Sequence, residues 1–407
     1  MPSVLGRELV IVRGSGAYVT TESGDELLDG TACLWRTNVG HGRAEIADAV
    51  AAQIRQLETY HVFDRFANQA ALDLAERLRE LSPVADSRVF FTSGGSDAVE
   101  LACKLSRRYW QAKGRESKQI VVSRANSYHG LHAYGTSIAG LGGNREGYGS
   151  ESLIPETARI PHSDLEGALE AIDHISPDRV ASIVVEPIMG TGGVITAPPG
   201  YLSGLRDYCL DNDILFIADE VITGFGRAGE MFASTRFDLE PDMVLVAKGI
   251  TSGYLPLGGV LIAPTVWEPF YASTESPVFR HGLTYSGHSA CCAAAMANLD
   301  ILEREKLVDR AGRLEQQLRQ SLTRLEDLPG VAEVRAGAGF MAGIRLIDEL
   351  NPSIVVDAML DRGIITRAIN DGVLQISPPF VISEADLTRL VDQFHETIDE
   401  AYQGLEG

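Results

Sequence analysis

Residues 214–259 read ILFIADEVITGFGRAGEMFASTRFDLEPDMVLVAKGITSGYLPLGG, and they contain two short apolar runs. Each run, 214–218 and 243–247, has the length of a buried strand. The first run is followed by Asp219, and the second by Lys248. In an open α/β sheet, ligands bind just outside the carboxyl ends of the strands. The pattern therefore predicts an acid and an amine at the two sides of one crevice.

This pairing of an acid with an amine has a known chemical use. A lysine held in an apolar pocket loses part of its charge and forms a Schiff base with a carbonyl group. A carboxylate that faces a pyridine nitrogen keeps that nitrogen protonated, and proteins hold pyridoxal phosphate with such a pair. A salt bridge at the sheet edge would explain the same two residues. The surrounding motifs must therefore distinguish a cofactor site from a salt bridge.

Composition sets the broad class of the protein. The chain has 407 residues, of which 45% are hydrophobic and 22% charged, as in ordinary globular proteins, and its length predicts two domains. The net charge of −21 argues against a nucleic-acid or anionic-membrane partner. We expect no membrane span and no signal peptide, because no apolar run reaches the necessary length and the first residues lack the signal pattern.

The five cysteines are dispersed and form no CxxC motif. They are typical of reduced thiols and predict a cytoplasmic protein. The histidines form no HExxH motif, so we expect no metal site.

Strand-like and helical segments alternate over most of the chain, which predicts an α/β fold with a large, mainly parallel seven-stranded sheet flanked by helices. Between a strand and a helix, residues 92–97 read TSGGSD, and the free N–H groups of such a helix start favour an anion. After His288, helices and short strands predict a smaller α+β domain. We expect residues 1–44 to pack with that domain (289–407), and residues 45–288 to form the large domain.

Eight motifs follow one another along the chain. They are CLWRTNVGHG (33–42), FFTSGGSDAVE (90–100), SRANSYHG (123–130), VVEPIMGTGG (184–193), FIADEVITGFGRAG (216–229), LVAKGITSGYLPLGG (245–259), HGLTYSGH (281–288) and GIITRAINDGVLQISPPFVIS (363–383). Together they resemble a class III aminotransferase of the fold-type I pyridoxal phosphate enzymes, closest to the ω-amine:pyruvate transaminases. The resemblance covers nearly the whole chain.

The resemblance implies that Lys248 binds the cofactor covalently and moves the substrate proton, and that Asp219 pairs with the pyridinium nitrogen. Other implied cofactor contacts are Val221 on one face of the ring, Tyr128 on the other with His129 placing it, and Glu186 in the same pocket. Two of these residues have a simpler explanation. Val221 could be a core valine, and Glu186 a surface acid at a strand end.

The phosphate is expected at Gly95 and Ser96. Thr284 is implied to reach the phosphate of another subunit, which predicts a homodimer with shared active sites. Two positions depart from the family pattern. Gly94 stands where family members often have serine, which removes a possible hydroxyl contact to the phosphate, and Thr191 replaces a small residue that often lines the pocket.

Arg367 matches the mobile arginine that grips the carboxylate of a keto acid, a contact suited to a bidentate guanidinium. The implied apolar walls for an amine are Trp35, Tyr60, Phe63 and Tyr128. An aromatic cluster is more often part of a core. Trp35 departs from that rule, because it lies in an irregular, glycine-flanked segment.

The leading functional hypothesis is transfer of an amino group from a primary amine to a keto acid such as pyruvate. The first alternative is a 4-aminobutyrate or diamine aminotransferase that uses 2-oxoglutarate. A glutamate-semialdehyde-type aminomutase would need no external acceptor. A catalytically inactive interaction protein is disfavoured by the presence of both Lys248 and Asp219.

Overall fold

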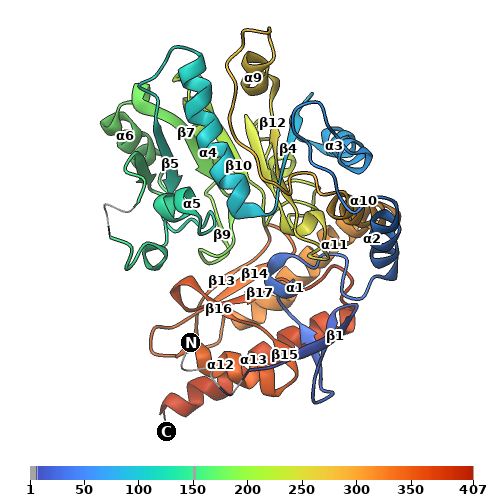
Figure 1. Cartoon of the computed structure of the whole chain (residues 1–407). Coiled ribbons are helices and arrows are strands. Elements are labelled where there is room, and N and C mark those ends of the chain that lie inside the picture. Colours follow the sequence, from blue (N-terminus) through green and yellow to red (C-terminus); the bar gives the residue numbers. More distant parts are fainter. Residues whose placement is uncertain (1–5, 7, 150–152, 407) are drawn as a thin grey trace.

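A seven-stranded sheet lies at the centre of the computed structural model, which describes residues 6, 8–149 and 153–406 (Figure 1). The strand order is β4-β12-β11-β10-β7-β5-β6. The strands are β4 (Arg88–Thr92), β5 (Ile120–Arg124), β6 (Thr157–Ile160), β7 (Val180–Val185), β10 (Leu215–Asp219), β11 (Met243–Val246) and β12 (Gly258–Ile262). Only β12 runs antiparallel to its neighbours, so the predicted mainly parallel sheet is confirmed.

Helices cover both faces of this sheet, as the apolar strands require. Successive side chains of β10 alternate between the faces: Leu215 and Ile217 pack with α4 (Gly95–Ala112) and α5 (Ala133–Ile138). Phe216 packs on the opposite side, with α6 (Leu165–Ile175) and α7 (Tyr201–Asp211). Val244 and Val246 of β11 also face that side, where they join the cluster formed by α2 (Ala44–Gln56), α3 (Gln69–Leu81) and α10 (Ser289–Arg304).

Two smaller sheets lie in the lower half of Figure 1, where the blue N-terminal strands adjoin the orange and red C-terminal elements. One contains β1 (Ile11–Ser15), β2 (Tyr18–Thr21), β3 (Glu26–Asp29) and β15 (Ile364–Ile365). The other contains β13 (Val331–Arg335), β14 (Ala342–Leu346), β17 (Val373–Ile376) and β16 (Ala368–Ile369). The remaining C-terminal helices are α11 (Leu307–Leu322), α12 (Pro352–Asp361) and α13 (Glu384–Glu406).

The pairing of β3 with β15 joins the two ends of the chain, since Leu28 lies opposite Ile364. This contact supports our proposal that residues 1–44 pack with a domain formed by residues 289–407. Further elements are a two-stranded sheet of β8 (Ile188–Met189) and β9 (Ile195–Thr196) and the short helices α8 (Ala233–Arg236) and α9 (Pro264–Trp267). None of the helices in the described part of the chain is long and apolar enough to cross a membrane.

The glycine-flanked segment after β3 contains a left-handed turn. All four residues of α1 (Ala32–Trp35) have positive φ angles, between 45° and 69°. L-residues avoid this region, at a cost of about 1–2 kcal/mol each. The turn buries Trp35 and leaves the neighbouring Leu34 exposed.

Candidate active site

Several strands end at one edge of the central sheet, around a cavity of about 160 Å³. Asp219 is the last residue of β10, Glu186 directly follows β7, and Lys248 comes two positions after the end of β11. Eight of the expected cofactor residues line this cavity: Gly95, Ser96, Tyr128, His129, Glu186, Asp219, Val221 and Lys248. The cavity therefore lies at the carboxyl ends of the strands, where an open α/β sheet is expected to bind a ligand.

The Asp219 carboxylate is held in a fixed orientation. Its Oδ2 lies 2.7 Å from Nδ1 of the buried His129, and its Oδ1 accepts a hydrogen bond from the Val221 amide at 3.2 Å. The His129 Nε2 atom has no hydrogen-bond partner within the described part of the chain. The histidine therefore supports Asp219 through its Nδ1 atom.

Lys248 has a backbone conformation that lysine rarely adopts, with φ at 45°. A side chain of α10 fixes the backbone that follows Lys248. The buried Asn298 amide donates to the carbonyl oxygens of Gly249 (2.9 Å) and Ile250 (3.0 Å). These contacts fix the backbone that presents the lysine to the cavity. Asn298 was not expected from the sequence, since it lies in an unremarkable helix.

Burial lowers the pKa of Lys248 to about 8, although the negative charges of Asp219 and Glu186 act in the opposite direction. Burial also raises the pKa of Glu186, whose carboxylate accepts hydrogen bonds from the amides of Tyr128 (2.9 Å) and Gly190 (3.1 Å). The lowered pKa favours the neutral amine, which is the form that attacks a carbonyl.

We expect cofactor capture to depend on pH through Lys248. At pH 7, about one tenth of the Lys248 side chains are neutral with a pKa of about 8, against about one in 3,000 with the ordinary value of 10.5. The rate at which cofactor-stripped protein binds pyridoxal phosphate should therefore rise from pH 6 and level off above about pH 8. Stopped-flow absorbance measures this rate, and a tenfold rise per pH unit that continues to pH 10 would contradict the lowered pKa.

The start of α4 supplies the expected anion site. Its first N–H groups have no partner within the helix, and the positive end of the helix dipole lies there. The backbone is closely packed: a Cβ atom at Gly130 would lie 2.3 Å from the Ser96 hydroxyl, and one at Gly95 would lie 3.0 Å from a Val221 methyl group. A helix start for a phosphate, a carboxylate for a ring nitrogen and an amine for an aldehyde fit pyridoxal phosphate.

Five predicted residues do not line this cavity: Trp35, Tyr60, Phe63, Thr284 and Arg367. Trp35 is 1% exposed and packs behind it, in a cluster that includes the lining residue Ile222. Tyr60 and Phe63 are 45% and 39% exposed, and Thr284 is also exposed. The roles of these residues stay predictions. Tyr60, Phe63 and Thr284 are exposed on this chain and can contact another molecule.

Arg367 lies near the cavity, where its charge acts on the pKa of the Tyr128 hydroxyl. Its Nε donates to Oε1 of Gln375 at 2.6 Å, and burial lowers the pKa of Arg367 itself. Gln375 was not expected from the sequence, because its position depends on the register between β16 and β17. The glutamine holds the guanidinium by one nitrogen, and no residue in the described part of the chain accepts a hydrogen bond from its terminal N–H groups.

The comparisons with known proteins agree with this geometry. The model of the class-III aminotransferase family matches residues 3–398. The chain belongs to this family. Class III aminotransferases depend on pyridoxal phosphate, so the protein is an aminotransferase with this cofactor.

Individual class III relatives cover nearly the whole chain. A putrescine–pyruvate aminotransferase of Pseudomonas aeruginosa is 34% identical, over 96% of this chain and 90% of its own. A diaminobutyrate–2-oxoglutarate transaminase of Halomonas elongata is 33% identical, over 97% and 91%. Among solved structures, a PLP-bound amine transaminase from an uncultivated Pseudomonas species has a TM-score of 0.92 and 36% identity, over 97% and 95% of the two chains.

Proposed function

We propose that this aminotransferase transfers the amino group of a primary amine to a keto acid such as pyruvate, in two half-reactions. The observation that carries this proposal is the placement of Arg367, which Gln375 tethers beside Tyr128 with terminal N–H groups that no described residue occupies. A guanidinium in this state suits the carboxylate of a keto acid. The relatives named for pyruvate and for amines support the same choice.

We propose that the residues of the cavity divide the work as follows. When bound, the cofactor would supply an aldehyde carbon that carries the amino group and a ring that withdraws electrons from the reacting carbon. Lys248 moves the proton at the reacting carbon, because its lowered pKa allows the amine to accept and return a proton near neutral pH. Asp219 holds a proton at the ring nitrogen, and His129 holds Asp219 in position.

The same proposal assigns the walls of the site. Val221 and Tyr128 cover the two faces of the ring, and Glu186 fixes the Tyr128 backbone through the hydrogen bond from its amide. Gly95 and Ser96 bind the phosphate at the start of α4. Trp35 contributes to the substrate side indirectly, because it supports the lining residue Ile222 from behind.

We further propose a homodimer in which each chain completes the site of the other. Tyr60, Phe63 and Thr284 are exposed on the single chain, and none lines its cavity. A second copy would bring the threonine to the phosphate and the two aromatic rings to the amine. The cytoplasmic location also stays a proposal, based on the five unpaired cysteines.

A half-reaction tests the proposed substrates. The purified, cofactor-loaded protein is mixed with a hydrophobic primary amine that has no carboxylate, and the visible band of the lysine-bound cofactor is followed. We expect the band to disappear and to return when pyruvate is added. A band that ignores this amine but responds to 4-aminobutyrate or a diamine, and returns only with 2-oxoglutarate, would favour the first alternative. Turnover without any acceptor would favour an aminomutase.

Removing the Arg367 guanidinium should separate the two half-reactions. We expect Arg367→Ala to raise the KM for pyruvate by about 10- to 100-fold, because charge-assisted hydrogen bonds to the carboxylate are lost. The rate with a carboxylate-free amine should change less than about threefold. Arg362→Ala is the matched control, since that arginine is paired with Glu400 on the surface. Equal losses in both half-reactions would mean that another residue holds the carboxylate.

A further inference from the structure

A second cavity, of about 260 Å³, adjoins the cofactor cavity. The two cavities share Gly95, Ala247 and Lys248. Among the described residues that line the second cavity, Arg36 and Lys248 are the only charged ones, and no acid is present. Because the amine of Lys248 is committed to the cofactor, Arg36 is the cation that this cavity offers to an anion.

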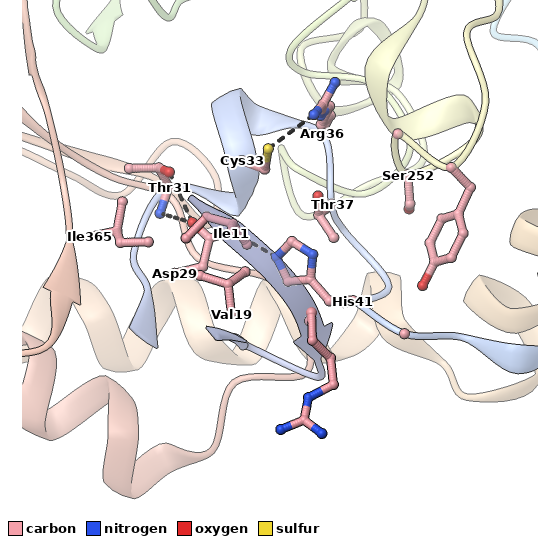
Figure 2. A pocket seen from close by; sticks show the side chains of 15 residues that line it. Ile11, Val19, Asp29, Thr31, Cys33, Arg36, Thr37, His41, Ser252 and Ile365 are labelled. Carbon is pink, nitrogen blue, oxygen red and sulfur yellow. Dashed lines mark hydrogen bonds and ion pairs between the residues drawn. The ribbon is translucent and has the colours of Figure 1, made fainter. Parts of the chain in front are cut away.

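Arg36 also borders an outer cavity of about 400 Å³ between the N-terminal strands and residues 252–254 (Figure 2). Figure 2 shows its side chain turned away from the Asp29–His41 pair. Gly253 makes room for it: a Cβ atom at Gly253 would lie 2.7 Å from Cδ and 3.0 Å from Nε of Arg36. The glycine thus keeps the arginine at the boundary between the two cavities.

The Arg36 guanidinium is not committed to an acidic partner in the described structure. Its one hydrogen bond goes from Nη2 to the Cys33 sulfur at 3.1 Å, and sulfur is a weak acceptor (Figure 2). Arg43, seven residues later, makes two hydrogen bonds of 2.9 and 2.8 Å to Glu305. Arg43 thus has a structural partner, whereas Arg36 keeps N–H groups for a ligand.

The start of α4 is short of positive charge for a phosphate. Gly94 has no side chain, and the Ser93 amide already donates to Asp97 at 3.2 Å. The Asp97 carboxylate adds a negative charge to the first turn, and among the described residues its ion-pair contact is to the His132 imidazole, at 3.3 Å. A phosphate dianion bound here would therefore benefit from a nearby guanidinium.

We propose that Arg36 binds the phosphate of the cofactor and replaces the hydroxyl contact that is missing at Gly94. Both residues line the same cavity beside Gly95 and Lys248. The inference rests on the proposed phosphate site at Gly95 and Ser96. It adds a residue from the N-terminal segment to that site and accounts for a departure from the family sequence.

The dissociation constant of the cofactor-stripped protein for pyridoxal phosphate tests this proposal. We expect Arg36→Met to weaken pyridoxal phosphate about 10- to 100-fold and to leave pyridoxal, which lacks the phosphate, unchanged. Arg36→Lys should lose less, because it keeps the charge. Arg43→Met is the control, since Arg43 lines neither the outer cavity nor the second cavity.

A second substitution should restore the lost affinity. Gly94 has an extended φ of 175°, and a Cβ atom there would meet no atom within 4 Å, so Gly94→Ser fits without a clash. In the Arg36→Met background, Gly94→Ser should recover a large part of the affinity for pyridoxal phosphate. The same change in the native background should have a smaller effect.

Two results would overturn the proposal. If Arg36→Met leaves pyridoxal phosphate binding intact and raises the KM for pyruvate, Arg36 binds the substrate carboxylate instead. If pyridoxal and pyridoxal phosphate weaken equally, the variant has disturbed the fold of the site. The binding measurements use no amine or keto acid. They therefore stay valid even if the protein does not use the proposed substrates. If the native protein binds both cofactor forms equally well, the phosphate site at Gly95 and Ser96 is itself wrong.

Discussion

Lys248→Ala should lower kcat for amine and keto acid by at least about 10⁴-fold, because it removes both the covalent attachment and a proton-transfer group that alone contributes about 10²–10⁴-fold. Lys248 is the only amine among the described residues that line the cofactor cavity. Thermal unfolding should stay cooperative, since shortening a side chain that borders a cavity leaves the core packing intact. Steady-state kinetics and circular dichroism measure the two properties.

Lys118 offers a matched control for the loss of a buried amine. Burial lowers its pKa to about 8, as for Lys248, but its ammonium group donates to three backbone carbonyl oxygens away from the cavity. Lys118→Met should reduce the melting temperature and preserve the activity of the folded fraction. Normal turnover by Lys248→Ala would refute the proposed mechanism, whatever the control shows.

Asp219→Asn should lower kcat by about 10³-fold, the upper range for loss of one preorganised electrostatic group in an active site. The change keeps the shape of the side chain and a hydrogen-bond acceptor for His129. It removes the charge that, in the proposed mechanism, holds a proton at the ring nitrogen. The affinity for pyridoxal phosphate should fall by a much smaller factor than kcat does, because Lys248 and the start of α4 remain. Equilibrium binding and single-turnover rates separate the two effects.

Glu220, the next residue, provides the control for Asp219. Its buried carboxylate accepts hydrogen bonds from Thr223 and from the amides of Ala233 and Ser234, and it does not line the cavity. Glu220→Gln should therefore lower stability and leave kcat nearly unchanged. Similar kcat losses in Asp219→Asn and Glu220→Gln would show that the first effect is structural.

The central sheet, and the grouping of most expected cofactor residues around one cavity, could be predicted from the sequence for a physical reason. Apolar runs that end in Asp219 or Lys248 identify both a buried strand and the residue at its carboxyl end. Parallel strands place these ends at one edge of the sheet, so the approximate position of the site follows without any side-chain contact.

Other features depend on three-dimensional geometry that the hydrophobic periodicity of the sequence does not predict. The left-handed turn that buries Trp35 has no hydrophobic pattern, and the contact of Gln375 with Arg367 depends on how β16 and β17 pair. The exposed positions of Tyr60 and Thr284 also could not be derived from a motif. Their proposed roles require a second copy of the chain.

The parallel pairing of β3 with β15 constrains when the N-terminal sheet is completed during synthesis. Leu28 leaves the ribosome before Ile364, its partner, has been made. The interval of about 340 residues corresponds to about 20 to 70 s of translation. For that time the edge of β3 that binds β15 has no partner from its own chain, so the nascent protein exposes a strand edge open to pairing with other chains until translation is nearly finished.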